Sequence, residues 1–292
     1  MPMLPLSSVC ARSPVLLVLA AVWVNAPACA STGPSAPPAH ASPVLQHSQR
    51  TAPTDARYAA LAAQANDDLR RGHFAAALEA ADHALALVPF ALEAGLAKVE
   101  AHLQLGQRTA ALDYASRLVD ARPGEAATLY AEGRALLSMS RAQDAAPVFQ
   151  AALVAATAAR APLDETFALL GLLTALAYDV DVPLAELVSR ADELAQRVTS
   201  DLDPRPDALH ALGIACELRK LGDDRAAAFY RDALALRPDA HPYAHLNLAK
   251  LLDASTGRAA ARTHFEAFIA QAPPSARAEV ERIQKLLQED TP

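Results

Sequence analysis

The sequence is short of the residues that fill a thick globular core. Aromatic residues make up only 5% of its 292 positions, although 52% of the residues are hydrophobic. With alanine dominating the apolar set, closely packed pairs of helices suit the composition better than a wide core. Runs of valine, isoleucine, threonine and aromatics, which signal strands, are also missing, while alanine is the strongest helix former. We therefore expect an all-α fold.

Cysteine and clustered positive charge are scarce as well. Cys10, Cys29 and Cys216 include no CxxC pair, so neither a metal cluster nor a disulfide framework is expected. Cys216 lies in a helical, alanine- and leucine-rich stretch, where a thiol usually acts as a small buried hydrophobe. The net charge of −7 and the scattered basic residues argue against a sequence-independent grip on nucleic acid. We expect no nucleic-acid partner and no cofactor.

Residues 1–30 have the layout of a signal peptide. Arg12 gives a positive start, and residues 15–24 give an apolar stretch that is too short to span a bilayer. Two cleavage sites compete. Residues 28–30 (ACA) fit ordinary signal peptidase, whereas residues 26–29 (APAC) resemble a bacterial lipobox that would lipidate Cys29, with alanine where leucine is usual.

Residues 31–54 hold five prolines among serine, alanine and glutamine. Such a run cannot bury a core, so the sequence predicts a disordered linker here. The folded part is expected to begin at residue 55.

From residue 55 the chain repeats itself every 34 residues. The recurring pairs are Gly72 and Gly106, Ala77 and Ala111, Ala81 and Ala115, and Pro89 and Pro123. A fixed period of this length indicates stacked copies of one helical unit. Alanines at three- and four-residue spacing lie on one face of a helix, and the proline ends that helix. The pattern predicts helices over 58–70 and 74–87 in the first copy.

This pattern resembles the tetratricopeptide repeat (TPR). Gly72, Phe74 and Ala77 stand where that family keeps glycine, an aromatic and a small residue. The resemblance implies a right-handed α-solenoid of about six helix pairs over residues 55–274. An amphipathic helix over residues 275–290 is expected to cap its exposed end.

The fourth copy departs from the period. Helices are expected there over 163–178 and 184–199, followed by a connection over 201–206, because the residues before Pro204 and Pro206 are pushed away from helix.

The resemblance implies a concave groove, lined by the first helix of each pair, that binds an extended peptide or a helix of another protein. The positions that face this groove in the family are occupied here by Asn66, Arg70, Glu93, Glu100, Tyr130, Arg134, His210, Glu217, Tyr243, Asn247 and Lys250. Such a protein is a scaffold and not an enzyme.

The sequence holds no phosphate loop, HExxH helix or GxSxG elbow. His241 and His245 are the best candidate metal ligands, because i, i+4 spacing places them on one helix face. However, His241 precedes Pro242 at a predicted helix start, and no third ligand stands at suitable spacing. We expect no metal site.

A signal peptide, a linker and these repeats together resemble the bacterial TPR lipoproteins of the cell envelope. The resemblance implies an outer-membrane lipoprotein facing the periplasm, or a soluble periplasmic protein if Cys29 is not lipidated. Three roles remain open: assembling an envelope complex, docking cell-wall enzymes, or serving as an accessory subunit that binds a small ligand.

Overall fold

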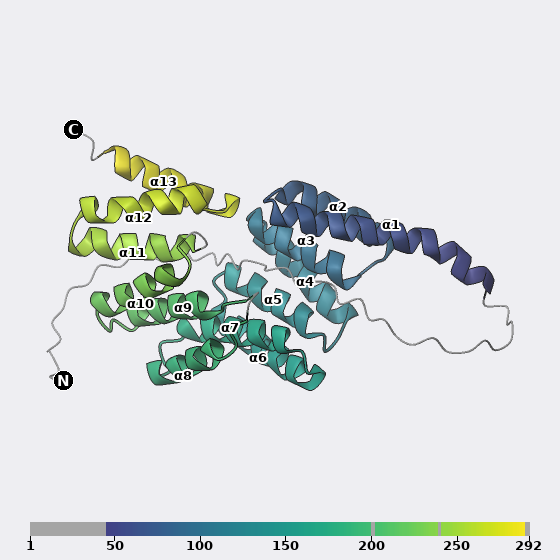
Figure 1. The fold of residues 1–292 in the computed structure, drawn as a ribbon, viewed down its shortest axis with the longest axis horizontal. Helices are drawn as coiled ribbons and strands as arrows, with labels where there is room; N and C mark the ends of the chain where they lie inside the picture. Colours follow the sequence, from purple (N-terminus) through teal and green to yellow (C-terminus); the bar gives the residue numbers. More distant parts are fainter. Residues whose placement is uncertain (1–44, 200–201, 239–240, 290–292) are drawn as a thin grey trace.

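The structure is a computed structural model that describes residues 45–199, 202–238 and 241–289. The predicted signal peptide, with Cys29, and residues 31–44 of the predicted linker lie outside these ranges. Within them the chain forms helices joined by short connections and no strand (Figure 1). The prediction of an all-α fold is confirmed.

Helices that lie next to each other in sequence form six antiparallel pairs, which we number as repeats 1 to 6, and a last helix follows them. The described helices are α1 Leu45–Arg70, α2 Phe74–Leu87, α3 Leu92–Gln104, α4 Arg108–Ala121, α5 Ala126–Ser138, α6 Ala142–Ala159, α7 Pro162–Ala177, α8 Leu184–Ala195, α9 Arg205–Leu218, α10 Asp223–Leu236, α11 Pro242–Ser255, α12 Arg258–Gln271, the 3-10 helix η1 Pro274–Ala276, and α13 Arg277–Gln288. In the described part of the chain, none of them is long and apolar enough to cross a membrane.

α1 begins before both predicted boundaries. Its first residue is Leu45, whereas the helix was predicted from residue 58 and the folded part from residue 55, so the end of the predicted disordered linker is helical. Residues 45–52 (LQHSQRTA) contain no proline, and leucine, glutamine, arginine and alanine are good helix formers. The prolines of the linker are concentrated before residue 44, and composition averaged over the whole segment concealed this change.

Small residues set the distance between helices. Ala77, Ala111 and Ala145, one period apart, are fully buried. Where repeat 3 meets repeat 4, a Cβ added at Gly133 or Gly171 would lie only 2.7 or 2.4 Å from the ring of Phe149. The two glycines therefore leave room for one aromatic side chain between α5, α6 and α7.

The connection that follows repeat 4, between α8 and α9, differs from its prediction at both ends. α8 ends at Ala195, four residues early, and α9 begins at Arg205, inside the predicted connection over 201–206. Pro204 is the N-cap of α9 and Pro206 lies in its first turn, where a missing backbone N–H costs nothing. Here the prolines begin a helix, whereas the sequence suggested that they delay it.

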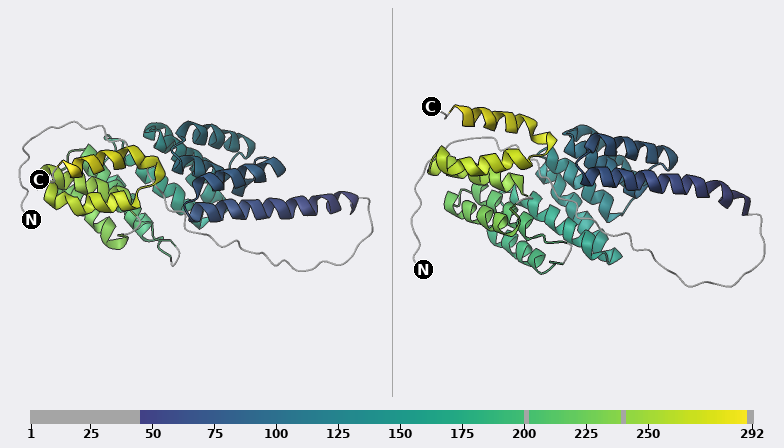
Figure 2. Two further views of the ribbon diagram at one scale, coloured as in Figure 1. Left: turned by 90° about the horizontal axis from the view of Figure 1, so that it is seen from above. Right: turned by 45° about the horizontal axis from the view of Figure 1, so that its top comes forward.

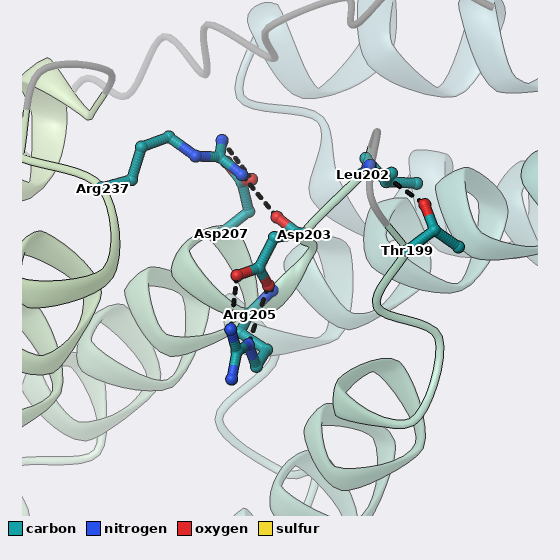
Figure 3. A network of polar contacts seen from close by, with 6 residues as sticks. All are labelled: Thr199, Leu202, Asp203, Arg205, Asp207 and Arg237. Carbon is teal, nitrogen blue, oxygen red and sulfur yellow. Dashed lines mark hydrogen bonds and ion pairs between the residues drawn. The ribbon is translucent and has the colours of Figure 1, made fainter.

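Polar contacts fix the connection between α8 and α9 (Figure 3). The Asp203 carboxylate accepts bonds from the backbone N–H and the guanidinium of Arg205, at 3.0 and 2.9 Å. Arg237, just after α10, donates to the carbonyl of Asp203 and, at 3.4 Å, to the carboxylate of Asp207. The start of α9 is thereby tied to the end of its partner helix.

Arg219 holds repeat 4 against repeat 5. Its guanidinium donates to the carbonyls of Ala177 and Val182 at 2.9 Å each, and also to the carbonyl of Asp179. These carbonyls belong to the end of α7 and the turn after it, and the last carbonyls of a helix have no partner within it. One side chain thus caps α7 and fixes the irregular connection between α7 and α8.

The array bends until distant repeats touch. η1, after α12, contacts α3, and both figures show α12 and α13 beside the first repeats (Figures 1 and 2). A Cβ added at Gly106 would lie 3.6 Å from both Cα and Cβ of Ser275. This contact between repeat 2 and the segment after repeat 6 was not expected, because the repeats of a solenoid normally contact only their neighbours.

The last helix covers the end of the array. As expected, α13 packs on α12, with Ile283 and Leu287 buried.

Candidate protein-binding face

The odd-numbered helices form the inner layer of the solenoid. α1, α3, α5 and α7 each contact the next odd-numbered helix, whereas within the described ranges no even-numbered helix makes a comparable contact with the next even-numbered one. A side-chain bond between His210 and Asn247 joins α9 and α11. Helices on the side of smaller radius come closer together, so the odd-numbered helices line the concave face. This is the face that the sequence predicts for binding.

In repeats 1 and 2 the predicted residues reach solvent. Arg70 and Glu93 are exposed, and Asn66 is half-buried. Arg70 Nη2 lies 3.1 Å from Asp67 Oδ1, an exposed ion pair that contributes little. Asn66 Nδ2 donates to the carbonyl of Ala62 at 3.1 Å. The bond of Asn66 is local to one helix, so this side chain can turn toward a partner at small cost.

An ion pair between repeats 2 and 3 forms the floor of this face. The guanidinium of Arg134 on α5 donates to both carboxylate oxygens of Glu100 on α3, and only 10% and 8% of these side chains are exposed. Gln104 Nε2 donates to the same carboxylate at 2.8 Å. Burial opposes the charge on Arg134, but Glu100 and Tyr130 outweigh it and raise the pKa of the guanidinium. The guanidinium therefore stays charged, and its hydrogen bonds to Glu100 fix it in place.

Tyr130 lies beside this ion pair. Its ring is 5.9 Å from the guanidinium carbon of Arg134 and 5.7 Å from the rings of Phe149 and Phe167. Burial raises the pKa of the phenol to about 12, and the charges of Glu100 and Asp207 add to the shift. Three consecutive inner helices thus contribute to one aromatic and charged centre.

In repeats 5 and 6 the predicted residues bond to one another. His210 on α9 and Asn247 on α11 are buried, and Asn247 Nδ2 lies 3.2 Å from His210 Nε2. With the amide nitrogen donating, Nε2 accepts this bond, and Nδ1 of His210 is buried without a hydrogen-bond partner in the described part of the chain. Burial, together with the nearby His241, lowers the pKa of His210 well below its usual value. The imidazole is therefore neutral in the folded protein.

The other predicted residues of these repeats are also occupied within the chain. Glu217 accepts a hydrogen bond from the hydroxyl of Tyr230, and burial raises the pKa of this carboxyl. Lys250 Nζ lies 2.9 Å from Glu279 Oε1 on α13, and Tyr243 is buried. The structure thus places the eleven predicted residues on inner helices, but those of repeats 5 and 6 serve internal contacts. Partner binding by any of the eleven stays a prediction.

The histidines of α11 point to different partners. His241, the N-cap of the helix, places Nε2 3.1 Å from Asp207 Oδ1. His245 Nδ1 lies 2.9 Å from His264 Nδ1 on α12. Among the described residues, no group of three or more His, Cys, Asp or Glu side chains could hold a metal ion.

Sequence reasoning missed Phe167 and Asp207 on the inner face. Asp207 lies close enough to Tyr130 for its charge to affect the phenol. Asp207 lies three residues before His210, the first groove residue predicted in the fifth copy. The family's groove pattern, aligned on Gly213 of the same helix, would have included Asp207 as well. Phe167 belongs to the irregular repeat 4, which offers no register, so no signal pointed to it.

No protein-family model and no curated protein matches the sequence, but solved structures do. YrrB, a TPR protein with an unusual peptide-binding site, is 21% identical, covers 60% of this chain and 84% of its own, and gives a TM-score of 0.41. The APC/C hetero-tetramer Cut9-Hcn1 is 14% identical, covers 82% of this chain and 45% of its own, and gives 0.59. A tetratricopeptide repeat protein from Parabacteroides merdae is 14% identical, covers 78% and 87%, and gives 0.46.

The TM-score of 0.59 marks a likeness of fold. It agrees with the six antiparallel helix pairs and with the sequence period of 34 residues. Together these observations show that the chain has the fold of a tetratricopeptide-repeat α-solenoid.

Proposed function

We propose that the chain is a non-enzymatic scaffold that binds an extended peptide or a helix of a partner protein on the concave face of repeats 1 to 3. One observation carries the proposal. In these repeats the inner-face side chain of Glu93 reaches solvent on α3. The same helix carries Glu100, which forms a charged and aromatic centre with Arg134 and Tyr130. In repeats 5 and 6 the corresponding side chains serve internal contacts.

This centre suits recognition more than chemistry. Tyr130 presents a ring that a partner side chain can stack on, and Asn66 can pair with the backbone of an extended segment. Glu100 and Arg134 already neutralise each other's charge. The pair can therefore orient a bound partner, but it does not form a new buried ion pair with it. Binding should be spread over the face and modest per contact.

We further propose that this scaffold works at the bacterial cell envelope and helps to assemble an envelope complex. The N-terminal sequence supports this, because residues 1–30 have the features of a signal peptide and Cys29 stands at a lipobox-like site. In this proposal a lipid on Cys29 anchors the chain to the outer membrane, facing the periplasm.

Two other roles remain candidates. Without lipidation, the chain would be a soluble periplasmic scaffold that docks cell-wall enzymes. As an accessory subunit it would bind a small ligand, and an open, apolar depression outside the concave face favours this second role. It is lined by Gly124, Leu129, Pro147, Gln150, Ala151, Val154, Ala155, Ala158 and Ala159.

Cross-linked affinity capture from native envelopes tests the proposal, with the full-length chain tagged at its C-terminus. The variant carrying Asn66→Ala and Glu93→Ala should lose the captured partner, whereas Glu79→Ala, on the exposed surface of the outer helix α2, should keep it. Equal capture by both variants would refute the concave-face site.

Membrane partition of Cys29→Ser, scored in the same samples, tests the anchor. We expect the wild type in the membrane fraction and the serine variant in the soluble fraction. Wild type and variant both soluble, with the same partners, would replace the anchored scaffold by a free periplasmic one.

A further inference from the structure

The contact between η1 and α3 closes the solenoid into a ring that runs from repeat 2 to repeat 6. At its centre the backbone of Gly106, in the turn between α3 and α4, meets Ser275 in η1. Gly106 has φ +74°, a conformation that favours glycine, and it has no Cβ to hold the two turns apart. Arg108, in the first turn of α4, lies close enough to the Tyr243 hydroxyl for its charge to affect the phenol.

Two polar groups at this contact lack partners. The hydroxyls of Ser275 and Tyr243 are buried, and neither has a hydrogen-bond partner in the described part of the chain. A buried hydroxyl without a partner forfeits the hydrogen bonds that it would make with water. Opening the contact would return both groups to solvent, so the closed state is only weakly favoured.

The closed ring also encloses the centre of the concave face. Tyr130, on α5, is half-buried, and the charge of Asp207, on α9, affects its phenol. An extended segment needs a continuous path along the inner helices, and closure leaves it no lateral entry between repeat 2 and repeat 6.

We propose that the contact between the Gly106 turn and η1 is a latch that opens and closes, and that its opening admits a partner segment to the concave face. The proposal rests on the proposed function, since it describes how that same face is regulated. Small changes of rotation at each repeat add up along an array, so the two ends can separate while every helix pair stays folded.

Thiol labelling of the full-length chain tests whether the latch opens. Ser275→Cys, in a chain whose Cys10 and Cys29 are replaced by serine, places a reporter at the contact. The native Cys216 is fully buried in α9 and reports unfolding of the repeat core. Ser189→Cys, exposed on α8, gives the rate for an open thiol. We expect the thiol at position 275 to react about tenfold or more faster than Cys216 without denaturant, as expected for local opening.

A disulfide tests whether the latch controls access. In a chain without native cysteines, Gly106→Cys with Ser275→Cys would place the two Cβ atoms about 3.6 Å apart, within the range for a disulfide. Circular dichroism checks that the reduced variant folds despite the positive φ. A phage-displayed library of random peptides is panned on the reduced protein, and the bound pool is assayed against both states. Oxidation should lower binding by about tenfold, and reductant should restore it.

The outcomes separate the latch from the proposed function. Labelling of position 275 as slow as that of Cys216, or equal peptide binding by the oxidised and reduced proteins, overturns the latch and leaves the scaffold intact. Fast labelling with no peptide bound in either state supports the opening motion and overturns the concave-face function.

Discussion

Repeats 1 and 2 differ from repeat 5 at one buried position of the outer helix. Ala81, Ala115 and Tyr230 occupy equivalent places in the outer helices α2, α4 and α10, and all three are fully buried. The alanines let the helices pack with no polar atoms between them. Tyr230 brings a hydroxyl into the core, which bonds to Glu217 and lies 3.4 Å from Asn247 Nδ2.

The difference shows how one outer-helix residue decides the use of the inner face. Where the outer helix contributes alanine, inner-helix side chains such as Glu93 face solvent, and the buried Glu100 bonds to Arg134 of the next inner helix and not to the outer helix. Where it contributes tyrosine, inner-helix side chains turn inward to satisfy the buried hydroxyl, because a buried polar group without a partner is costly. The same helix pair can thus serve recognition in repeats 1 and 2 and internal support in repeat 5.

The largest effect should come from removing the side chain that supports the C-terminal repeats. Arg219→Ala leaves the carbonyls at the end of α7 without their charged donor, so we expect the free energy of unfolding to fall by about 2–3 kcal/mol. Arg70→Ala, on the exposed side of repeat 1, should cost less than about 0.5 kcal/mol. Urea unfolding measures both. Equal losses would mean that Arg219 does not fix repeat 4.

The next largest effect concerns one glycine of repeat 5 and one of repeat 2, which differ in the side chain that faces them. A Cβ at Gly213 would lie 2.4 Å from the ring of Tyr230, whereas one at Gly95 would lie 3.0 Å from the methyl ends of Leu118, which can move. Gly213→Ala should therefore destabilise by about 2 kcal/mol through overpacking. Gly95→Ala should be neutral or stabilise by up to about 1 kcal/mol, because alanine favours helix. Thermal melts followed by circular dichroism separate them, and a stable Gly213→Ala protein would contradict the rigid setting of Tyr230.

Acid should weaken the buried network of repeats 5 and 6. His210 stays neutral in the folded protein because its pKa is lowered, whereas in the unfolded chain it takes up a proton near pH 6.5. This group leaves stability unchanged above that pH and lowers it as the pH falls, by about 1.4 kcal/mol at pH 5.5.

His210→Leu should lose this part of the pH dependence, although its stability at pH 7.5 changes as well. Urea unfolding at pH 7.5 and 5.5 gives the difference for each protein, and His83→Leu, on the exposed face of α2, controls for the loss of an imidazole. The same decrease in wild type and His210→Leu would exclude the assigned role.

The smallest effect is expected on the open face. Asn66 bonds only within its own helix, and Glu93 is exposed. The free energy of unfolding of Asn66→Ala and of Glu93→Ala should therefore change by less than about 0.5 kcal/mol. Differential scanning calorimetry measures this. A larger loss in either variant would show that the inner face of repeats 1 and 2 is structural, like that of repeat 5.

The sequence predicts the regular part of the fold well, because the 34-residue period records local requirements. It placed α2 over 74–87, as observed. It failed where no period exists, as at the start of α1 and around α8.

The sequence predicted which positions lie on the inner face, but not which of their side chains are exposed and which bond to one another. The bonds of His210 and Asn247 join α9 and α11, whose separation follows from small rotations summed over several repeats. The summed rotation of the repeats also brings Gly106 into contact with Ser275. No local pattern in the sequence predicts this rotation.

That closing contact changes how the molecule should come apart. An open solenoid behaves as a one-dimensional array, in which a terminal repeat frays without disturbing distant ones. Here η1 touches α3, so repeats 2 to 6 form a circuit with no free end at the C-terminal side. While this contact is closed, loss of order in α12 would be transmitted through η1 to repeat 2, which makes fraying at this side a cooperative event.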